Sequence, residues 1–221
     1  MKSFHSIDGS IVAPQGFLTA GLFCDVKRLG TGKGSNKGQK RDLAVIVSEV
    51  PATAAGMFTT NQICAAPVKV CVDHITDGKA QAVVINSGNA NACTGPRGLK
   101  DAQEMAALLA EELLLQPEDV LVGSTGRIGL ELPMPNIRTG IRQIVKELDD
   151  APTAAHHAAE AIMTSDTRPK EIAVEFKLGG QTVRLGGIAK GAGMIQPGMS
   201  PTGARPASMH LHATMLAYLT T

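Results

Sequence analysis

Residues 82–95 read AVVINSGNANACTG, and this stretch decides the fold of the chain. Its first four residues are apolar and either small or β-branched, which is typical of a buried strand. The polar residues after them predict a loop. Residues 98–115 then repeat apolar side chains at helical spacing, with acidic residues in the early turns. A buried strand that leads through a polar loop into an amphipathic helix is a building unit of layered α/β folds.

Three further segments predict strands. Residues 43–47 (LAVIV) and 120–122 (VLV) have the short apolar pattern of buried strands, and the second ends at Gly123. Residues 172–185 predict a hairpin that turns at Gly179-Gly180, because β-branched runs lie on both sides of the two glycines.

Two further amphipathic segments predict helices, at residues 133–150 and 154–163. Helices and strands are thus mixed along the chain, and the hairpin implies antiparallel pairing. The sequence therefore predicts an α/β or α+β fold in layers. We expect one domain over residues 1–221.

The composition limits the class of protein. Hydrophobic residues make up 43% of the 221 residues and the formal net charge is +1, which predicts a folded core and neither nucleic acid nor a membrane surface as the partner. No apolar run approaches the ~20 residues of a transmembrane helix, and residues 1–10 lack the apolar segment of a secretory signal. The four cysteines show no CxxC spacing, so we expect reduced thiols, a cytoplasmic protein and no metal site.

The run from Asn86 to Gly95 leaves two interpretations open. Its three asparagines can orient a polar substrate through their amides, since loops after strands often bind ligands. They can equally bond only to the nearby backbone of a turn. Cys93 in this run is expected to be a buried small apolar residue, because no histidine lies at a spacing that would make it a nucleophile.

Three other stretches carry hydroxyl groups. Gly123-Ser124-Thr125-Gly126 follows a strand, and a backbone N–H beside the Thr125 hydroxyl would make an oxyanion hole, although the stretch alone favours an ordinary turn. Residues 164–167 (TSDT) close the alanine-rich helix and are either a polar helix end or hydroxyls that line a pocket. Residues 213–214 place a threonine behind an alanine, and cleavage there would give one residue both a nucleophile and an amine base.

Six stretches in order resemble the ornithine acetyltransferase family, the bifunctional glutamate N-acetyltransferases of the cyclic arginine pathway. They span most of the chain, and the asparagine-rich run is highly specific. The stretches are residues 42–49 (DLAVIVSE), 86–95 (NSGNANACTG), 124–129 (STGRIG), 162–170 (IMTSDTRPK), 189–199 (AKGAGMIQPGM) and 213–219 (ATMLAYL).

The resemblance implies a self-cleaving acetyltransferase. Such a precursor cuts itself into an α and a β chain, here between Ala213 and Thr214. Thr214 would then bind substrate as the nucleophile, taking acetyl from N-acetylornithine and passing it to glutamate through an acetyl-threonyl intermediate. Some members also use acetyl-CoA as the donor, and no other cofactor is implied.

Four further residues match functional positions of the family. Thr125 and Gly126 match its oxyanion-hole pair. Thr164 and Lys190 match its substrate-binding positions on the α chain, where a lysine suits a substrate carboxylate.

The resemblance also implies a fold and an assembly. The fold is the layered αββα arrangement shared with self-cleaving N-terminal-nucleophile aminopeptidases, and the assembly is an α2β2 heterotetramer. Residues 1–213 would form the α segment and residues 214–221 the start of a β segment whose remainder is missing.

One departure from the family pattern keeps two alternatives open. In the family, Ala-Thr directly follows the methionine of the glycine-rich run, whereas residues 200–212 separate them here. The first alternative is a catalytically incomplete fragment that acts only as a partner subunit. The second is an aminopeptidase or amidohydrolase on the same fold.

Overall fold

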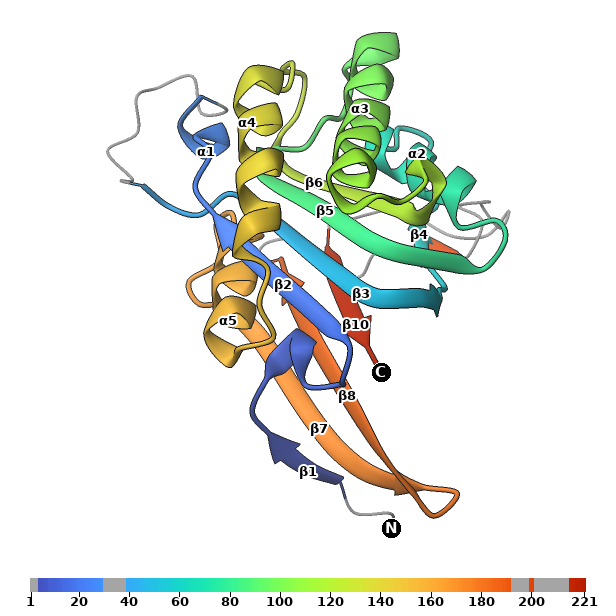
Figure 1. Cartoon of the computed structure of the whole chain (residues 1–221). Helices are drawn as coiled ribbons and strands as arrows, with labels where there is room; N and C mark the ends of the chain where they lie inside the picture. The colour runs from blue at the N-terminus through green and yellow to red at the C-terminus, as the bar shows by residue number, and fades with distance from the viewer. Residues whose placement is uncertain (1–3, 30–38, 192–198, 201–214) are drawn as a thin grey trace.

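The computed structural model describes residues 4–29, 39–191, 199–200 and 215–221, and most of its strands form two four-stranded sheets (Figure 1). Sheet A is antiparallel throughout and has the order β1 (Phe4–Ile7), β7 (Lys170–Leu178), β8 (Gln181–Lys190), β10 (Leu216–Thr220). Sheet B has the order β2 (Phe17–Leu22), β3 (Leu43–Thr53), β5 (Lys79–Asn89), β6 (Val120–Arg127). Its β5–β6 pair is parallel and its other pairs are antiparallel. A short pair joins β4 (Phe58–Thr59) to β9 (Met199–Ser200).

The helices lie mostly on one side of sheet B, as Figure 1 shows for α3 and α4. The helical segments are η1 (Ser10–Val12), α1 (Val26–Leu29), α2 (Ala66–His74), α3 (Gly95–Leu113), η2 (Pro117–Asp119), α4 (Met134–Ile144), η3 (Val145–Glu147) and α5 (Pro152–Ala161). Within the described residues, none of them is both long and apolar enough to span a bilayer.

Sheet B is buried on both faces, which explains why its strands are continuously apolar. In β3, Leu43, Val45 and Val47 pack in the cluster that contains α3 and α4. Ala44 and Ile46 alternate with them and pack in a second cluster with α5 and sheet A. Successive side chains of a strand point to opposite faces, so a strand between two packed layers has no polar face.

The second cluster joins the two sheets. Ile85 of β5 and Ile188 of β8 are both almost fully buried in it. The aromatic ring of Tyr218 on β10 reaches toward β6, since a Cβ on Gly123 would lie 2.2 Å from the Tyr218 hydroxyl. Sheet A therefore forms the second layer of a β-sandwich.

Helix α2 covers the edge strand β6. The Cys71 thiol donates to the carbonyl of Val122 at 3.1 Å, and its sulfur accepts the N–H of the same residue at 3.3 Å. The His74 ring nitrogen Nδ1 contacts the carbonyl of Val120 at 2.8 Å. Such contacts provide partners for the backbone N–H and C=O groups on the free side of the edge strand. Unpaired, these groups can bind a strand of another chain.

The predicted helices and the hairpin are confirmed, with the hairpin turning at Gly179-Gly180. The helix expected over residues 133–150 ends at Ile144 and continues only as the short η3. Three predicted strand ends are wrong, because β3 continues past an irregularity to Thr53, β5 to Asn89 and β6 to Arg127. The polar residues in the extensions of β5 and β6 stay in the ladder because their side chains find partners inside the protein, as described below. A polar stretch is therefore not a reliable strand end when its hydrogen bonds can be satisfied internally.

The predicted mixed α/β fold in layers is confirmed as a helical layer, sheet B and sheet A (Figure 1). The fourth layer of the implied αββα arrangement is not part of the described residues. On the side of sheet A away from sheet B, several large apolar side chains are exposed, among them Phe4, Ile172 and Leu219.

Candidate functional site

The carboxyl ends of β5 and β6 approach each other at two glycines. Gly88 and Gly126 are register partners, and the ladder becomes irregular at the next residue, Asn89. A Cβ on Gly126 would lie 2.3 Å from the carbonyl carbon of Gly88, and a Cβ on Gly88 would lie 2.6 Å from Cα of Lys27. Both glycines also have positive φ, 135° and 106°. Only glycine fits at these positions, and irregular pairing of this kind often lies beside active sites.

The asparagines of the run are fully buried, and their amides bond within the protein. Asn86 donates from Nδ2 to the carbonyl of Asn89 at 2.9 Å and accepts from the Ser124 hydroxyl at 2.6 Å. Asn89 donates to the carbonyls of Leu130 and Glu131 at 3.1 and 3.0 Å. These bonds join the end of β5 to β6 and to the loop that follows β6.

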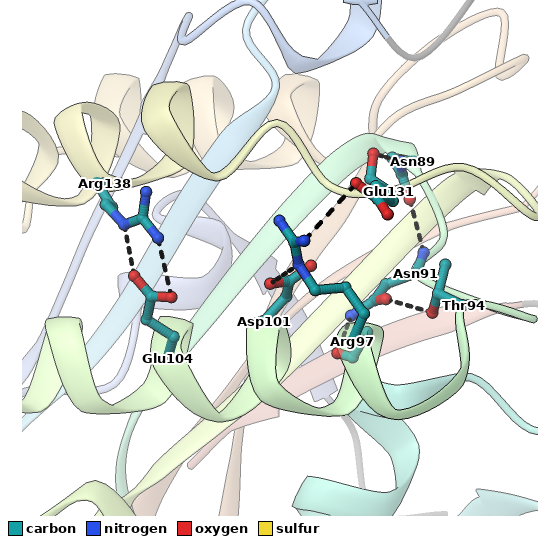
Figure 2. A network of polar contacts seen from close by, with 9 residues as sticks. Asn89, Asn91, Thr94, Arg97, Asp101, Glu104, Glu131 and Arg138 are labelled. Atoms are coloured by element: carbon teal, nitrogen blue, oxygen red, sulfur yellow. Dashed lines mark hydrogen bonds and ion pairs between the residues drawn. The ribbon is translucent and has the colours of Figure 1, made fainter.

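Asn91 joins the end of β5 to the start of α3 (Figure 2). Its Nδ2 donates to the carbonyl of Gly98 at 2.8 Å, and its Oδ1 accepts from the Thr94 hydroxyl at 2.7 Å. Its N–H donates to Oδ1 of Asn89 at 2.8 Å. The amides bond within the protein, as the turn interpretation expected, but not only to nearby backbone, because Asn86 and Asn89 reach partners on β6 and in the loop after it.

Cys93 is exposed, so the expectation that it is buried is wrong. Asn91, Cys93 and Gly95 all have positive φ, at 46°, 57° and 61°. The chain makes a tight turn here before α3, and this turn leaves the Cys93 side chain at the surface.

A charged network lies on α3 beside these amides (Figure 2). Arg97 contacts Asp101 at 3.3 Å and Glu131 at 3.9 Å, and Arg138 donates to Glu104 at 3.1 Å. Asp101 is 4% exposed, and its Oδ2 has no hydrogen-bond partner among the described residues. Burial raises the pKa of Asp101, and the bond from Arg97 opposes the shift only in part.

A hydrogen bond between Lys190 and Thr125 joins the two sheets. Lys190 ends β8 in sheet A and donates from Nζ to Oγ1 of Thr125 on β6 at 2.9 Å. The two residues are 5% and 1% exposed. Burial lowers the pKa of Lys190, and Asp166 acts in the opposite direction. Because the Thr125 oxygen accepts from the amine, its own O–H can donate to a ligand.

Asp166 connects Thr164 with the end of β8. Its carboxylate accepts the N–H of Thr164 at 3.1 Å and that of Gly191 at 2.8 Å, and it also contacts the ammonium of Lys170. Burial alone would raise the pKa of Asp166, but the bonds from Lys170, Gly191 and Thr164 outweigh it and lower the pKa to about 2. The carboxylate is therefore ionised at any physiological pH.

Lys27 lies at the same end of β5. Its Nζ donates to the carbonyl of Arg41 and, at 3.5 Å, to that of Glu160. Its N–H donates to the buried carboxylate of Asp42 at 3.0 Å. Burial lowers the pKa of Lys27 to about 8 although Asp42 raises it. The amine thus titrates closer to neutral pH than an ordinary lysine, and the backbone of Lys27 packs on Gly88.

The structure brings together the predicted site residues that it describes. Thr125 and Gly126 are consecutive on β6, and Lys190 bonds to Thr125. Thr164 is joined through Asp166 to Gly191, the neighbour of Lys190. Their assigned roles stay predictions.

Ala213 and Thr214 lie outside the described residues, so cleavage between them stays a prediction as well. The described chain resumes at Met215, and Leu216 is the register partner of Lys190 in the β10–β8 pair. Thr214 thus stands two positions in the sequence before the residue that opposes Lys190.

Asp166 and Lys27 are not among the site residues predicted from the sequence. Asp166 was part of a recognised polar stretch, but nothing in the sequence indicated that it would bond to Gly191, 25 residues away. Lys27 contacts the carbonyl of Glu160, 133 residues away, and no local pattern signals such a contact.

Two surface cavities lie away from these residues. One is lined by Cys24 and residues 135–143 of α4, and the other by residues 14–15, 182–184 and Thr221. The Thr125–Lys190 contact is instead nearly closed to solvent.

Sequence comparisons identify relatives of the chain. The model of the ArgJ family matches residues 28–221. The arginine biosynthesis bifunctional protein ArgJ of Symbiobacterium thermophilum is 46% identical over 213 residues, which are 96% of this chain and 48% of that protein. The protein of the same name from Shouchella clausii is 44% identical over 222 residues, 100% of this chain and 48% of that protein. The chain spans about half the length of the curated relatives it matches.

Two solved structures share the fold. The arginine biosynthesis bifunctional protein ArgJ of Bacillus halodurans matches with a TM-score of 0.80 and 41% identity, covering 90% of this chain and 100% of the solved chain. The ornithine acetyltransferase of Mycobacterium tuberculosis, solved in complex with ornithine, matches with a TM-score of 0.79 and 36% identity over the same shares.

We predict that Asp101→Asn stabilises the protein at neutral pH. The folded-state pKa of Asp101 is raised, so its charge costs stability above that pKa, and this cost disappears as the pH falls through it. An asparagine amide carries no charge. We therefore expect the free energy of unfolding to rise by about 1 kcal/mol at pH 7, and this gain to vanish in acid. Urea unfolding as a function of pH measures the free energy.

Glu104→Gln, one turn along the same helix, is the matched control. Its bond to Arg138 lowers the pKa of Glu104, so this charge adds stability that is lost as the pH falls. The free energy of unfolding of this control variant should fall by about 0.5 kcal/mol at pH 7. An Asp101→Asn protein that is less stable than the wild type at pH 7 would contradict the prediction.

Proposed function

The chain belongs to the ArgJ family, and we propose that it supplies the oxyanion site and the substrate lysine of an acetyltransferase that moves acetyl groups from N-acetylornithine to glutamate in arginine biosynthesis. The observation that carries this proposal is the buried Lys190–Thr125 hydrogen bond between the two sheets. It brings together two residues that the family pattern assigns to one site. Acetyl-CoA is a second donor in the same proposal.

The position of the nucleophile in the sequence supports the proposal. Leu216 opposes Lys190 in the ladder, and Thr214 precedes Leu216 by two residues. After cleavage, the Thr214 amine would have an ordinary pKa of about 7.7–8.0, so a useful fraction would be neutral and able to accept the hydroxyl proton. An internal threonine has no such amine, and acetyl transfer would follow cleavage.

The proposed reaction proceeds in two half-reactions. The Thr214 oxygen attacks the acetyl carbonyl of N-acetylornithine while its proton moves to the Thr214 amine. The Thr125 O–H and the Gly126 N–H donate to the carbonyl oxygen as it gains negative charge. The bond from carbon to the ornithine nitrogen then breaks, and that nitrogen takes the proton. The glutamate amine then attacks the acetyl-threonine and gives a proton to the Thr214 amine. The ester bond breaks, the Thr214 oxygen takes that proton, and N-acetylglutamate leaves.

The charges around the site suit amino-acid substrates. Lys190 is buried and has one described hydrogen bond, to a neutral hydroxyl, which leaves its charge available to a carboxylate. The ornithine bound by the Mycobacterium tuberculosis relative is also an amino acid. Thr164, held beside the end of β8, would contact the same substrate.

The outer face of sheet A, defined as its side away from sheet B, supports a second part of the proposal. Phe4 pairs with Phe176, and Ile172 and Leu219 both pair with Gly187, so their side chains share this face. Phe4, Ile172 and Leu219 are 69%, 61% and 70% exposed. A contiguous exposed apolar surface of this kind marks an interaction site.

We assign this face to the half of the family protein that lies beyond this chain's match. The relatives are about twice as long as the chain, so a second half of similar size exists in them. The proposed cleavage also gives β10 to the β segment, and β10 is already the edge strand of sheet A. Helices of that half would complete the αββα arrangement over residues 1–221 as one domain. A cytoplasmic α2β2 heterotetramer is the corresponding assembly.

The proposed function is tested by cleavage and transfer together. We predict that the chain, combined with the second half of the family protein, breaks between Ala213 and Thr214 and transfers acetyl from N-acetylornithine to glutamate. Thr214→Ala should abolish both, since it removes the hydroxyl. Intact-mass spectrometry detects the break, and chromatography of N-acetylglutamate measures transfer. An intact, inactive wild type would favour a partner-only subunit, and peptide hydrolysis without transfer would favour an aminopeptidase.

Thr125→Val should lower kcat about 100- to 1,000-fold, because one of the two oxyanion donors is removed. Thr125→Ser keeps the hydroxyl and is the matched control, with kcat expected within about tenfold of the wild type. Steady-state kinetics with N-acetylornithine and glutamate measure both values. Equal kcat for the valine and serine variants would exclude Thr125 from the oxyanion site.

Ile172→Glu should prevent assembly with the second half of the family protein, because it places a charge in the centre of the apolar outer face. Lys177→Glu, a charge change on the opposite face of the same strand, should leave assembly intact. Size-exclusion chromatography of the mixed halves measures assembly. If Ile172→Glu assembles like the wild type, another surface holds the second half.

A further inference from the structure

Asp166 lies in the polar stretch at residues 164–167, and its carboxylate is fully buried. Its side chain has no exposed surface. One oxygen, Oδ1, accepts the N–H of Gly191 and contacts Lys170, and the other accepts the N–H of Thr164. A buried carboxylate is strongly disfavoured unless both of its oxygens are bonded in this way.

These bonds join two neighbouring segments of the chain to the distant end of β8. Thr164 follows α5, Lys170 begins β7, and Gly191 follows the last residue of β8. Asp166 thus ties the chain after α5 to the end of β8 where Lys190 projects toward Thr125. Loss of the carboxylate would leave two backbone N–H groups without their partner.

Gly191 also connects Asp166 to the start of β10. Gly191 has φ 139°, and a Cβ on it would lie 3.1 Å from Cγ of Met215. Met215 precedes Leu216, the register partner of Lys190. The backbone that Asp166 holds therefore packs directly on the first described residue after the proposed nucleophile.

Asp166 also provides negative charge near Lys190. The Lys190 amine is buried and its one described bond is to a neutral hydroxyl. Burial lowers the pKa of Lys190, and Asp166 raises it. A carboxylate at this position thus favours the charged form of the lysine.

We propose that Asp166 is a positioning residue, which holds Thr164 and Lys190 in place relative to Thr125 by tying the chain after α5 to Gly191. The proposal rests on the proposed function for the assignment of these three residues to one site. Asp166 itself does not touch the reacting atoms. It acts through the backbone of Thr164 and Gly191 and through the charge of Lys190.

The test follows Lys190 directly. In Asp166→Asn, the charge and one acceptor are lost, and we expect the titration midpoint of the Lys190 amine to fall by about one pH unit. NMR of the chain with labelled lysine side chains measures the midpoint, and Lys190→Arg identifies the resonance. In the assembled enzyme, kcat should fall about 100-fold with a smaller change in KM, because Lys190 and Thr125 lose their mutual geometry.

Two further variants serve as controls. Asp166→Glu keeps the charge and should recover part of both the midpoint and kcat, which a merely structural role would not restore. Asp119→Asn removes a partly exposed carboxylate just before β6, at the other end of that strand from Thr125, and should change neither.

The outcomes separate the two proposals. An unchanged Lys190 midpoint and kcat in folded Asp166→Asn would overturn the positioning role. If that variant does not fold, wild-type values for both in Asp166→Glu would overturn it equally, since the longer side chain cannot hold the same three partners unchanged. A wild-type enzyme without transfer activity would reject the proposed function, and the Lys190 midpoint would still decide the role of Asp166.

Discussion

Sheet B is buried on both faces, and every polar group in it must find a partner inside the protein. Its strands run from apolar residues into the polar stretches at 86–89 and 124–126 without leaving the ladder. The amides of Asn86 and Asn89 supply hydrogen bonds there that water would supply in an exposed loop. Because these bonds are internal, the candidate site lies on hydrogen-bonded strands and not on a free loop.

The same constraint explains the charged residues of the site. Lys190 and Asp166 are costly to bury, and each is retained with bonded partners: a threonine hydroxyl for the lysine, and two backbone N–H groups for the carboxylate. A lysine that is buried and bonded to a neutral group keeps most of its charge for a ligand. Proteins often concentrate such perturbed groups where they bind or act on substrates.

The two sheets differ in how fully they are covered. The helical layer and sheet A enclose sheet B, whereas the outer face of sheet A exposes large apolar side chains. The chain also spans about half the length of its curated relatives. Both observations fit one physical explanation, in which a further layer buries that face and the strand β10 links the two halves of the protein.

Local patterns in the sequence predict most elements of this protein, and its ordered motifs indicate the family. Apolar periodicity predicted the helices, the buried strands and the hairpin, because local patterns reflect which face of an element is covered. The ordered motifs indicated the family. The family pattern then predicted site roles for Thr125, Gly126, Thr164 and Lys190. The predicted ends of β3, β5 and β6 came too early, and Cys93 was expected in the core. Composition does not reveal whether polar side chains find partners inside the protein.

Only the tertiary structure decided which residues meet. The bond between Lys190 and Thr125 spans 65 residues, and that between Asp166 and Gly191 spans 25. It also decided that the asparagine amides bond to the protein and that Gly88 and Gly126 allow two strands to touch. Such contacts depend on how the layers pack, and packing is a property of the whole chain that no local sequence pattern encodes.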